Sequence, residues 1–317
     1  MKVVILAFEG YGPWDDEVQT AEQVGAEVEI VDYDQLRQRP PHCDVLINSW
    51  GYPIPGDLLS QMAGCSLLIG YGTGTDYVDV DLAARLGIQV ANTPGLNVED
   101  VATHTLALLL ACVRKIVDYD TALRSGPFHS AAGHDCRRLQ GKTLGVLAFG
   151  RIPRRLRELV RPFAMRVLAC DPYVPAQDMR ALDVESVELE ELLHAAEILS
   201  VHTPATAKTR GLLTEERLRL LPRGAIVLIT GRGSVYDPDA LARLLHEGHL
   251  MAAGLDVFPQ EPLPHDHPLM SAPRAILTPH CAGDSMEAIA AYHRAGAEAL
   301  RAYAEGRPVP NVVNSHL

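Results

Sequence analysis

The sequence has 317 residues, enough for two domains of ordinary size, and its 47% hydrophobic and 21% charged residues are typical of a globular chain that buries large cores. A formal net charge of -12, without a long lysine or arginine cluster, argues against electrostatic binding to nucleic acid or anionic lipid and favours a small-molecule ligand. The longest apolar run, LALLLACV at residues 106–113, is far shorter than the ~20 residues that span a bilayer, so no membrane segment is expected.

The first 98 residues alternate short β-branched or apolar runs with polar, helix-forming stretches. The runs are KVVILAF, EVEIVDY, DVLINS, SLLIGYG and IQVANT. The stretches between them include EVQTAEQVGA and VDLAARLG. This rhythm predicts a parallel sheet with crossover helices.

A long helix and a second set of strands are predicted after TPGLN. Residues 98–119, VEDVATHTLALLLACVRKIVDY, have the length and apolar density of one largely buried helix that opens a second unit. The strand candidates that follow are KTLGVLAF, RVLAC, EILSVH, AIVLIT, MAAGLDV and AILT. The last helix candidate, residues 285–306, comes after this second set and can return to cover the first domain.

The order of these elements predicts an α/β protein with two doubly wound parallel-sheet domains. Residues 1–98 plus 285–317 are expected to form one domain, and residues 99–284 the other. Two domains joined by a double crossover are expected to leave a cleft between them, which is a usual place for a ligand.

The stretch LAFGRIPRR, residues 147–155, stands where a dinucleotide-binding domain carries its glycine-rich turn. The template G-x-G-x-x-G falls on Ala148, Gly150 and Pro153, so only the middle glycine is present. That glycine is the one that allows backbone to approach pyrophosphate, and the amides of Arg151 and Ile152 are then expected to point at the phosphates.

The context of this turn favours a cofactor, although an ordinary strand-turn-helix without a ligand also explains the turn alone. Asp171 ends the next strand candidate 21 residues after Gly150 (171 minus 150), close to the ~20 expected for the acid that binds ribose hydroxyls. Pro153 is tolerated in a first helical turn, where its missing N–H has no partner, but its ring is expected to weaken NAD binding by disturbing close helix packing. The arginines 154, 155 and 157 can hold phosphate or form a solvated helix face.

Several ordered segments resemble those of the D-isomer-specific 2-hydroxyacid dehydrogenases, with some likeness to the C-terminal-binding-protein and phosphoglycerate-dehydrogenase branches of that family. Residues 72–95, GTGTDYVDVDLAARLGIQVANTPG, are similar to its substrate-domain segment. The next similar segments are VATHTLALLLACVRK, LQGKTLGVLAFGRI with VLACDPYV, and SVHTPATAKTRGLL. GRGSVYDPDAL, AGLDVFPQEPLPHDHPL and LTPHCAG resemble the segments that supply the family's catalytic residues.

The resemblance implies a flavodoxin-like substrate domain, a Rossmann domain that binds NAD, and a homodimer. It implies hydride transfer between NAD and a 2-oxo or D-2-hydroxy acid, with His280 as acid and base, Glu261 as its partner and Arg232 as the carboxylate anchor. These residue types suit the reaction, because arginine offers a charged planar fork and a glutamate beside histidine favours the imidazolium.

The same resemblance implies further contacts. The amides of Thr73 and Gly74 are expected to bind the substrate carboxylate together with Arg232. The cofactor contacts that it implies are Gly150, Arg151, Ile152, Asp171, His202, Thr203, Thr230, Gly231, Asp256 and Gly283.

No metal site is expected. PHDHP at 264–268 and GHDC at 133–136 lack zinc-site spacing, and His104 is interpreted as a packed histidine at the core edge. The six cysteines lack C-x-x-C spacing and the N-terminus runs straight into a strand candidate, which predicts a reduced, cytoplasmic protein. The segment NSWGYPIPG has no cation, which disfavours a phosphorylated substrate.

A second function stays open at this point, because a fold does not decide a function. The alternative is a non-enzymatic NAD-sensing or partner-binding protein on the same fold, which Ala148 and Pro153 favour through a weakened cofactor site. The complete set of Arg232, Glu261 and His280 favours the enzyme.

Overall fold

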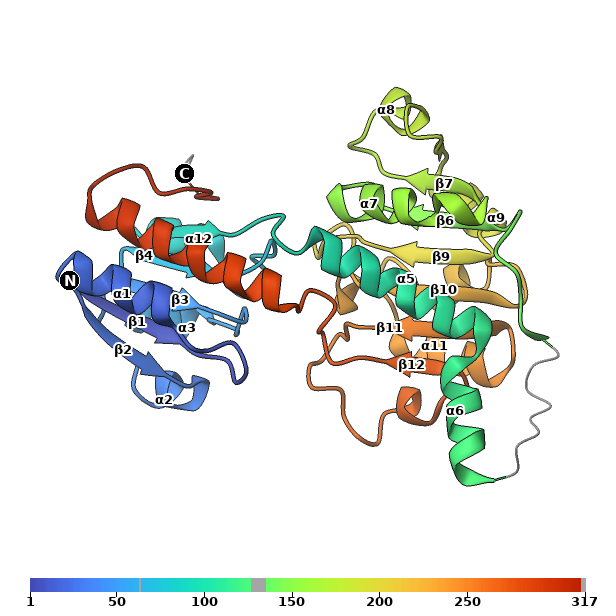
Figure 1. The fold of residues 1–317 in the computed structure, drawn as a ribbon, viewed down its shortest axis with the longest axis horizontal. Helices are drawn as coiled ribbons and strands as arrows, with labels where there is room; N and C mark the ends of the chain where they lie inside the picture. The colour runs from blue at the N-terminus through green and yellow to red at the C-terminus, as the bar shows by residue number, and fades with distance from the viewer. Residues whose placement is uncertain (63, 127–134, 315–317) are drawn as a thin grey trace. The chain divides into compact units, whose positions relative to one another are not determined.

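The computed structural model describes residues 1–62, 64–126 and 135–314 (Figure 1). The chain divides into two compact units, each described here by itself. Unit 1 comprises Met1–Asn97 and Ser285–Leu317, and unit 2 comprises Val98–Asp284. Within the described residues, no helix is both long and apolar enough to cross a membrane.

Unit 1 is built on a five-stranded parallel sheet in the order β2-β1-β3-β4-β5. The strands are β1 (Lys2–Leu6), β2 (Glu27–Val31), β3 (Val45–Asn48), β4 (Leu67–Gly70) and β5 (Gln89–Asn92). The inner strands β3 and β4 are buried along their whole length, which is why their sequences are continuous apolar runs. The edge strand β2 instead buries none of its residues, with Glu27, Glu29 and Ile30 exposed.

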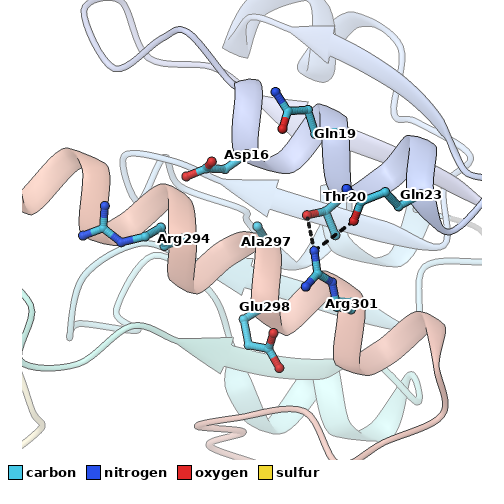
Figure 2. A pocket seen from close by; sticks show the side chains of 8 residues that line it. All are labelled: Asp16, Gln19, Thr20, Gln23, Arg294, Ala297, Glu298 and Arg301. Carbon is cyan, nitrogen blue, oxygen red and sulfur yellow. Dashed lines mark hydrogen bonds between the residues drawn. The ribbon is translucent and has the colours of Figure 1, made fainter.

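Helices cover the sheet of unit 1. They are α1 (Asp15–Gln23), α2 (Tyr33–Gln38), α3 (Gly56–Gln61), α4 (Val80–Arg85) and α12 (Met286–Ala304). The long α12 returns from the end of the chain and packs against α1. Figure 2 shows Arg301 of α12 reaching across a polar pocket to Thr20 and Gln23 of α1, at 3.4 and 3.0 Å.

Unit 2 has a seven-stranded parallel sheet in the order β12-β11-β10-β9-β6-β7-β8. Its strands are β6 (Thr143–Leu147), β7 (Arg166–Cys170), β8 (Glu185–Ser186), β9 (Ile198–Val201), β10 (Ala225–Ile229), β11 (Leu250–Leu255) and β12 (Ala275–Leu277). The strand order reverses between β6 and β9, and such a switch point is where doubly wound sheets bind ligands at their carboxyl ends. The predicted α/β fold with two parallel sheets is confirmed.

The helices of unit 2 are α5 (Val98–Arg114), α6 (Ile116–Ser125), α7 (Arg151–Val160), α8 (Ala176–Arg180), α9 (Leu189–Ala195), α10 (Glu215–Leu218) and α11 (Pro238–His246). Short 3-10 helices in the described part of this unit are η2 (Arg161–Phe163), η3 (Gly233–Val235) and η4 (Pro268–Ser271). The helix α5 packs against α7 and against β10 and β11.

The prediction of one helix over residues 98–119 was wrong. Lys115 has a left-handed backbone with φ 53, which ends α5 and starts α6. Its buried ammonium pairs with Asp135, and this partner holds the chain in the turn. The apolar density that suggested one helix belongs to α5, whereas α6 buries none of its residues.

Candidate active site

The turn between β6 and α7 has the backbone of a nucleotide-binding turn despite its missing glycines. Ala148, at the first template position, has φ 69, a left-handed conformation that costs an alanine roughly 1–2 kcal/mol. Its amide donates to the carbonyl of Cys170 at 2.9 Å, which ties the turn to the end of β7. The chain therefore has alanine at this position, in the backbone conformation that glycine favours.

Gly150, the N-cap of α7, is the residue that best fits a bound dinucleotide. Its φ of -78 is ordinary, and a Cβ built on it would meet nothing within 4 Å. Neither backbone conformation nor packing therefore requires glycine here, whereas close approach of a ligand to the backbone does. The first-turn amides of α7 have no intrahelical acceptors, and Pro153, the third helical residue, removes only a donor that the helix does not use.

Asp171 lies at the end of β7 and holds this turn in place. Its Oδ2 accepts the Phe149 amide at 2.8 Å, and its Oδ1 accepts the Tyr173 amide at 2.8 Å. Each oxygen keeps a second lone pair with which a ribose hydroxyl can bond.

The arginines of α7 have protein partners. The Arg155 guanidinium pairs with Glu99 and Glu158, and that of Arg157 with Asp183. The nitrogen Nε of Arg154 donates to the Phe149 carbonyl at 3.3 Å. These contacts favour a structural role of the three arginines over phosphate binding, and all three residues are half-buried rather than part of a fully solvated helix face.

The ends of β9 and β10 bring four more of the predicted cofactor residues together. A Cβ on Gly231 would lie 3.0 Å from the Thr203 carbonyl oxygen, tighter than an ordinary contact, so glycine suits the close approach of the two strand ends. The Nε2 of His202 lies 2.8 Å from Ser200 Oγ, while its buried Nδ1 has no hydrogen-bond partner among the described residues. Burial lowers the pKa of His202 to about 4, so the ring is neutral near pH 7. The hydroxyl of Thr230 lies 2.9 Å from that of Thr105 on α5.

His280 and Glu261 form a hydrogen-bonded pair beyond the ends of β11 and β12. His280 Nδ1 lies 2.8 Å from Glu261 Oε2, and Glu261 Oε1 accepts the Phe258 amide at 2.8 Å. Burial raises the pKa of Glu261. The hydrogen bond and charge of His280, with smaller contributions from Phe258 and Arg232, outweigh burial, so the pKa of Glu261 is lowered overall. Both side chains remain accessible, at 39% and 36% exposed.

Arg232 is held between two glycines that press on neighbouring backbone. A Cβ on Gly231 would lie 3.0 Å from the His202 carbonyl carbon, and a Cβ on Gly233 would lie only 1.9 Å from the Phe258 carbonyl carbon. Arg232 Nη1 donates to the Gly231 carbonyl at 2.9 Å. The GRG motif therefore fixes Arg232 beside the segment that carries Glu261.

Asp256 has a structural role that its predicted contact with the cofactor did not suggest. It is fully buried after β11, and three donors bond its carboxylate: Thr278 Oγ1 at 2.6 Å, the Cys281 amide at 3.0 Å and the Ala282 amide at 2.9 Å. The His280 amide donates to the Asp256 carbonyl at 2.8 Å. Asp256 therefore organises the segment that presents His280 and leads to Gly283.

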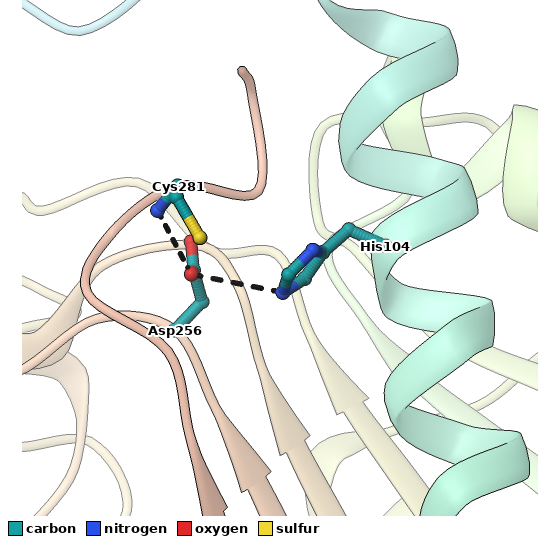
Figure 3. A group of neighbouring side chains, drawn as sticks. All are labelled: His104, Asp256 and Cys281. Carbon is teal, nitrogen blue, oxygen red and sulfur yellow. Dashed lines mark hydrogen bonds and ion pairs between the residues drawn. The ribbon is translucent and has the colours of Figure 1, made fainter. Parts of the chain in front are cut away.

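His104 is a neighbour of this network that the sequence interpretation had set aside. Its Nε2 lies 3.1 Å from Thr278 Oγ1. The same nitrogen lies 3.7 Å from Asp256 Oδ1, as Figure 3 shows. Among the described residues, one group of three side chains could together hold a metal ion, His104, Asp256 and Cys281. Gly133 and His134 of the GHDC segment lie outside the described residues.

Thr73 and Gly74 follow β4 in unit 1. Asn92 Nδ2 donates to the Thr73 carbonyl at 2.8 Å, and the Thr73 hydroxyl accepts the Gly95 amide at 3.4 Å. In the described part of the chain, the amides of Thr73 and Gly74 donate to no protein acceptor. They are thus able to bind an anion such as a carboxylate.

Several known proteins are similar to this chain. The family model described as "D-isomer specific 2-hydroxyacid dehydrogenase, NAD binding domain" matches residues 106–282. A glyoxylate reductase of Aeropyrum pernix is 38% identical over 288 residues, which cover 89% of this chain and 86% of that protein. The TT0316 protein of Thermus thermophilus has a TM-score of 0.88 at 34% identity, covering 99% of this chain and 100% of that one. A D-lactate dehydrogenase of Aquifex aeolicus, solved with NAD and lactic acid, has a TM-score of 0.86 at 25% identity, covering 100% of both chains.

Proposed function

The chain belongs to the D-isomer specific 2-hydroxyacid dehydrogenases, and we propose that Arg232, Glu261 and His280 are the residues with which it interconverts a 2-oxo acid and a D-2-hydroxy acid. As a member of this family it is an NAD-dependent oxidoreductase. In the direction of reduction, the 2-oxo acid, NADH and a proton give the 2-hydroxy acid and NAD. The bound cofactor supplies or accepts the hydride.

His280 is the acid and base of the proposed reaction. With Nδ1 bonded to Glu261, Nε2 is the ring nitrogen that delivers a proton to the carbonyl oxygen during reduction and takes it back during oxidation. Glu261 stays ionised because its pKa is lowered, and its charge then stabilises the imidazolium. The Phe258 amide fixes the other carboxylate oxygen, so the pair is oriented before substrate arrives.

Arg232 anchors the substrate carboxylate, because its guanidinium forms two parallel charge-assisted hydrogen bonds with a planar anion. The amides of Thr73 and Gly74 are proposed as a second carboxylate contact. On the cofactor side, Gly150, Arg151 and Ile152 would hold the pyrophosphate and Asp171 a ribose. The remaining proposed contacts are His202, Thr203, Thr230, Gly231, Asp256 and Gly283.

The observation that carries this proposal is the Glu261–His280 hydrogen bond beside the glycine-flanked Arg232. The test follows the absorbance of NADH with a panel of 2-oxo acids, beginning with glyoxylate because the similar Aeropyrum protein is a glyoxylate reductase. We expect turnover with at least one acid. His280→Ala and Arg232→Ala should each lower kcat/KM by about 10²- to 10⁴-fold.

One control variant and two named outcomes make this test decisive. His265→Ala, at an exposed histidine with no hydrogen bond or ion pair in the described structure, should keep wild-type turnover. Near-wild-type turnover in His280→Ala would refute the assigned acid and base. Turnover of no acid in either direction would favour the non-enzymatic alternative for this chain.

We also propose that the protein is a homodimer, which rests on the family resemblance. Sedimentation equilibrium of the purified protein should give twice the 34.5 kDa chain mass. A single-chain mass at micromolar concentration would contradict it.

A further inference from the structure

Three side chains that can bind metal converge beside the His280 segment, from three separate elements of unit 2. His104 projects from α5, Asp256 follows β11 and Cys281 follows β12, and Figure 3 shows the three turned toward one another. Their ligand atoms all lie within 4.8 Å of one another. The sequence separates them widely, so no spacing motif announces the group.

The donor atoms are an imidazole nitrogen, a carboxylate oxygen and a thiol sulfur. This mixture suits Zn²⁺ and the related ions Co²⁺ and Cd²⁺, and excludes Mg²⁺ and Ca²⁺, which prefer oxygen alone. Tetrahedral zinc with bonds of ~2.0–2.3 Å places its ligands roughly 3.4–3.7 Å apart. The side chains must therefore close by about 1 Å, which rotations of His104 and Cys281 can supply while Asp256 stays fixed.

The electrostatic setting also favours a cation. The Asp256 carboxylate is buried and accepts hydrogen bonds from one hydroxyl and two amides, and the His104 ring lies 3.7 Å from it. These donors orient the carboxylate as outer-shell partners orient metal ligands elsewhere. His104 and Cys281 are both partly exposed, which leaves a path for the ion and an open fourth position.

We propose that His104, Asp256 and Cys281 form a binding site for zinc-like divalent cations, at which the ion inhibits the enzyme by competing with NAD. On binding, Cys281 Sγ loses its proton to solvent and coordinates as the thiolate. The metal-binding part stands on the three side chains alone. The competition part rests on the proposed function, in which Asp256 is one of the residues that contact the cofactor.

The first test is titration of the metal-free protein with Co²⁺, without cofactor, by absorption spectroscopy. We expect one thiolate-to-cobalt charge-transfer band that saturates at one ion per chain. Cys281→Ala should remove the band, and His104→Ala should weaken Co²⁺ binding by at least about 10- to 100-fold, the loss that even outer-shell changes cause. Cys136→Ala is the matched control, because Cys136 is also half-buried in unit 2 but belongs to no ligand group of the described structure.

The second test adds NADH to the cobalt-loaded protein and measures turnover with Zn²⁺. Loss of the cobalt band on adding NADH, with zinc inhibition that raises the KM for NADH and disappears in Cys281→Ala, supports the whole proposal. A band that NADH does not displace overturns the competition while the metal site stands. Absence of the band, or its persistence in Cys281→Ala, overturns the metal site, and turnover of 2-oxo acids then shows that the proposed function survives.

Discussion

At the scale of single residues, the turn that departs from the glycine template carries measurable strain. Ala148 is left-handed with φ 69, so Ala148→Gly should relieve roughly 1–2 kcal/mol, of which about 0.4–1 kcal/mol is lost to the freer unfolded chain. We expect a net gain of about 1 kcal/mol or less in the free energy of unfolding, measured with urea. The affinity for NADH should rise as well, because the turn amides settle without strain.

Ala164→Gly is the matched control for this change. Ala164 is also left-handed, with φ 51, but it follows η2 and is no part of the turn. It should give a similar gain in stability with unchanged NADH affinity. Weaker NADH binding by Ala148→Gly than by the wild type would contradict the strain argument.

A substitution at Gly150 should have the opposite effect to Ala148→Gly, because it should weaken NADH binding. Because its Cβ would meet nothing, Gly150→Ala should leave the free energy of unfolding within about 1 kcal/mol of the wild type, the range of an N-cap change. NADH binding should weaken by about 10- to 100-fold, since a methyl group blocks roughly one charge-assisted phosphate bond. Calorimetric titration with NADH and urea denaturation measure the two effects separately.

Gly233→Ala supplies the contrast, because its Cβ would collide with the Phe258 backbone. That variant should lose stability and turnover together. If Gly150→Ala bound NADH as tightly as the wild type, the open space above α7 would not be the phosphate site.

At the scale of elements, a buried charged pair joins the first and last helices of the chain. Both ring nitrogens of His293 on α12 lie 2.7 Å from oxygens, Glu17 Oε1 of α1 and the Tyr11 carbonyl, so a ring that carries two protons can donate to both. Tyr71 also donates to Glu17, and Asp16 adds a further negative charge nearby. Burial lowers the pKa of His293, but the hydrogen bond and charge of Glu17 outweigh burial, so the pKa of His293 is raised overall.

This raised pKa predicts a pH-dependent stability. A histidine whose folded pKa exceeds its unfolded value of ~6.5 contributes stability that is fully present below pH ~6.5 and is lost as the pH rises through the folded pKa. Urea midpoints measured from about pH 6 to about pH 9 should therefore fall for the wild type. His293→Gln should be less stable at the acidic end and show a flatter profile, whereas His265→Gln should match the wild type throughout. A wild-type profile that rose over this range would show that His293 is neutral in the folded protein.

Most helices and strands could be predicted from the sequence, but some could not. Strands of both sheets were recognisable because buried parallel strands are short apolar runs, and helical covers followed from their periodicity. The helix break at Lys115 was not recognisable from the sequence. One residue with φ 53 and an ion-pair partner at Asp135 leaves the apolar pattern of the helix unchanged. The two-residue strand β8 is exposed and has no pattern at all.

The candidate site divides in a similar way. Arg232, Glu261 and His280 were assigned through motifs that resemble a known family, and their roles stay predictions. The place of His104 was not predictable, because its contact with Thr278 spans 174 residues and depends on which helix covers the ends of β11 and β12. For the same reason, the donors that surround Asp256 follow from strand order rather than from local sequence.

At the scale of the whole molecule, the two units have separate hydrophobic cores. Every buried apolar cluster among the described residues lies within one unit: two around the sheet of unit 2 and two around the sheet of unit 1. A chain with separate cores is not expected to unfold in one all-or-none step. Both tryptophans, Trp14 and Trp50, belong to unit 1, so their fluorescence reports on that unit alone.

This distribution of tryptophans predicts two different responses to the cofactor. A ligand stabilises only the folded unit that binds it, by about 2.7 kcal/mol at a concentration of roughly 100 times Kd. In urea, NAD should therefore shift the unit 2 transition seen by far-ultraviolet circular dichroism and leave the tryptophan transition of unit 1 in place. At the same NAD concentration, Gly150→Ala should show a much smaller shift of the unit 2 transition seen by circular dichroism. Its tryptophan transition should again not shift. Equal shifts of both signals in the wild type would mean that the units unfold as one cooperative block in spite of their separate cores.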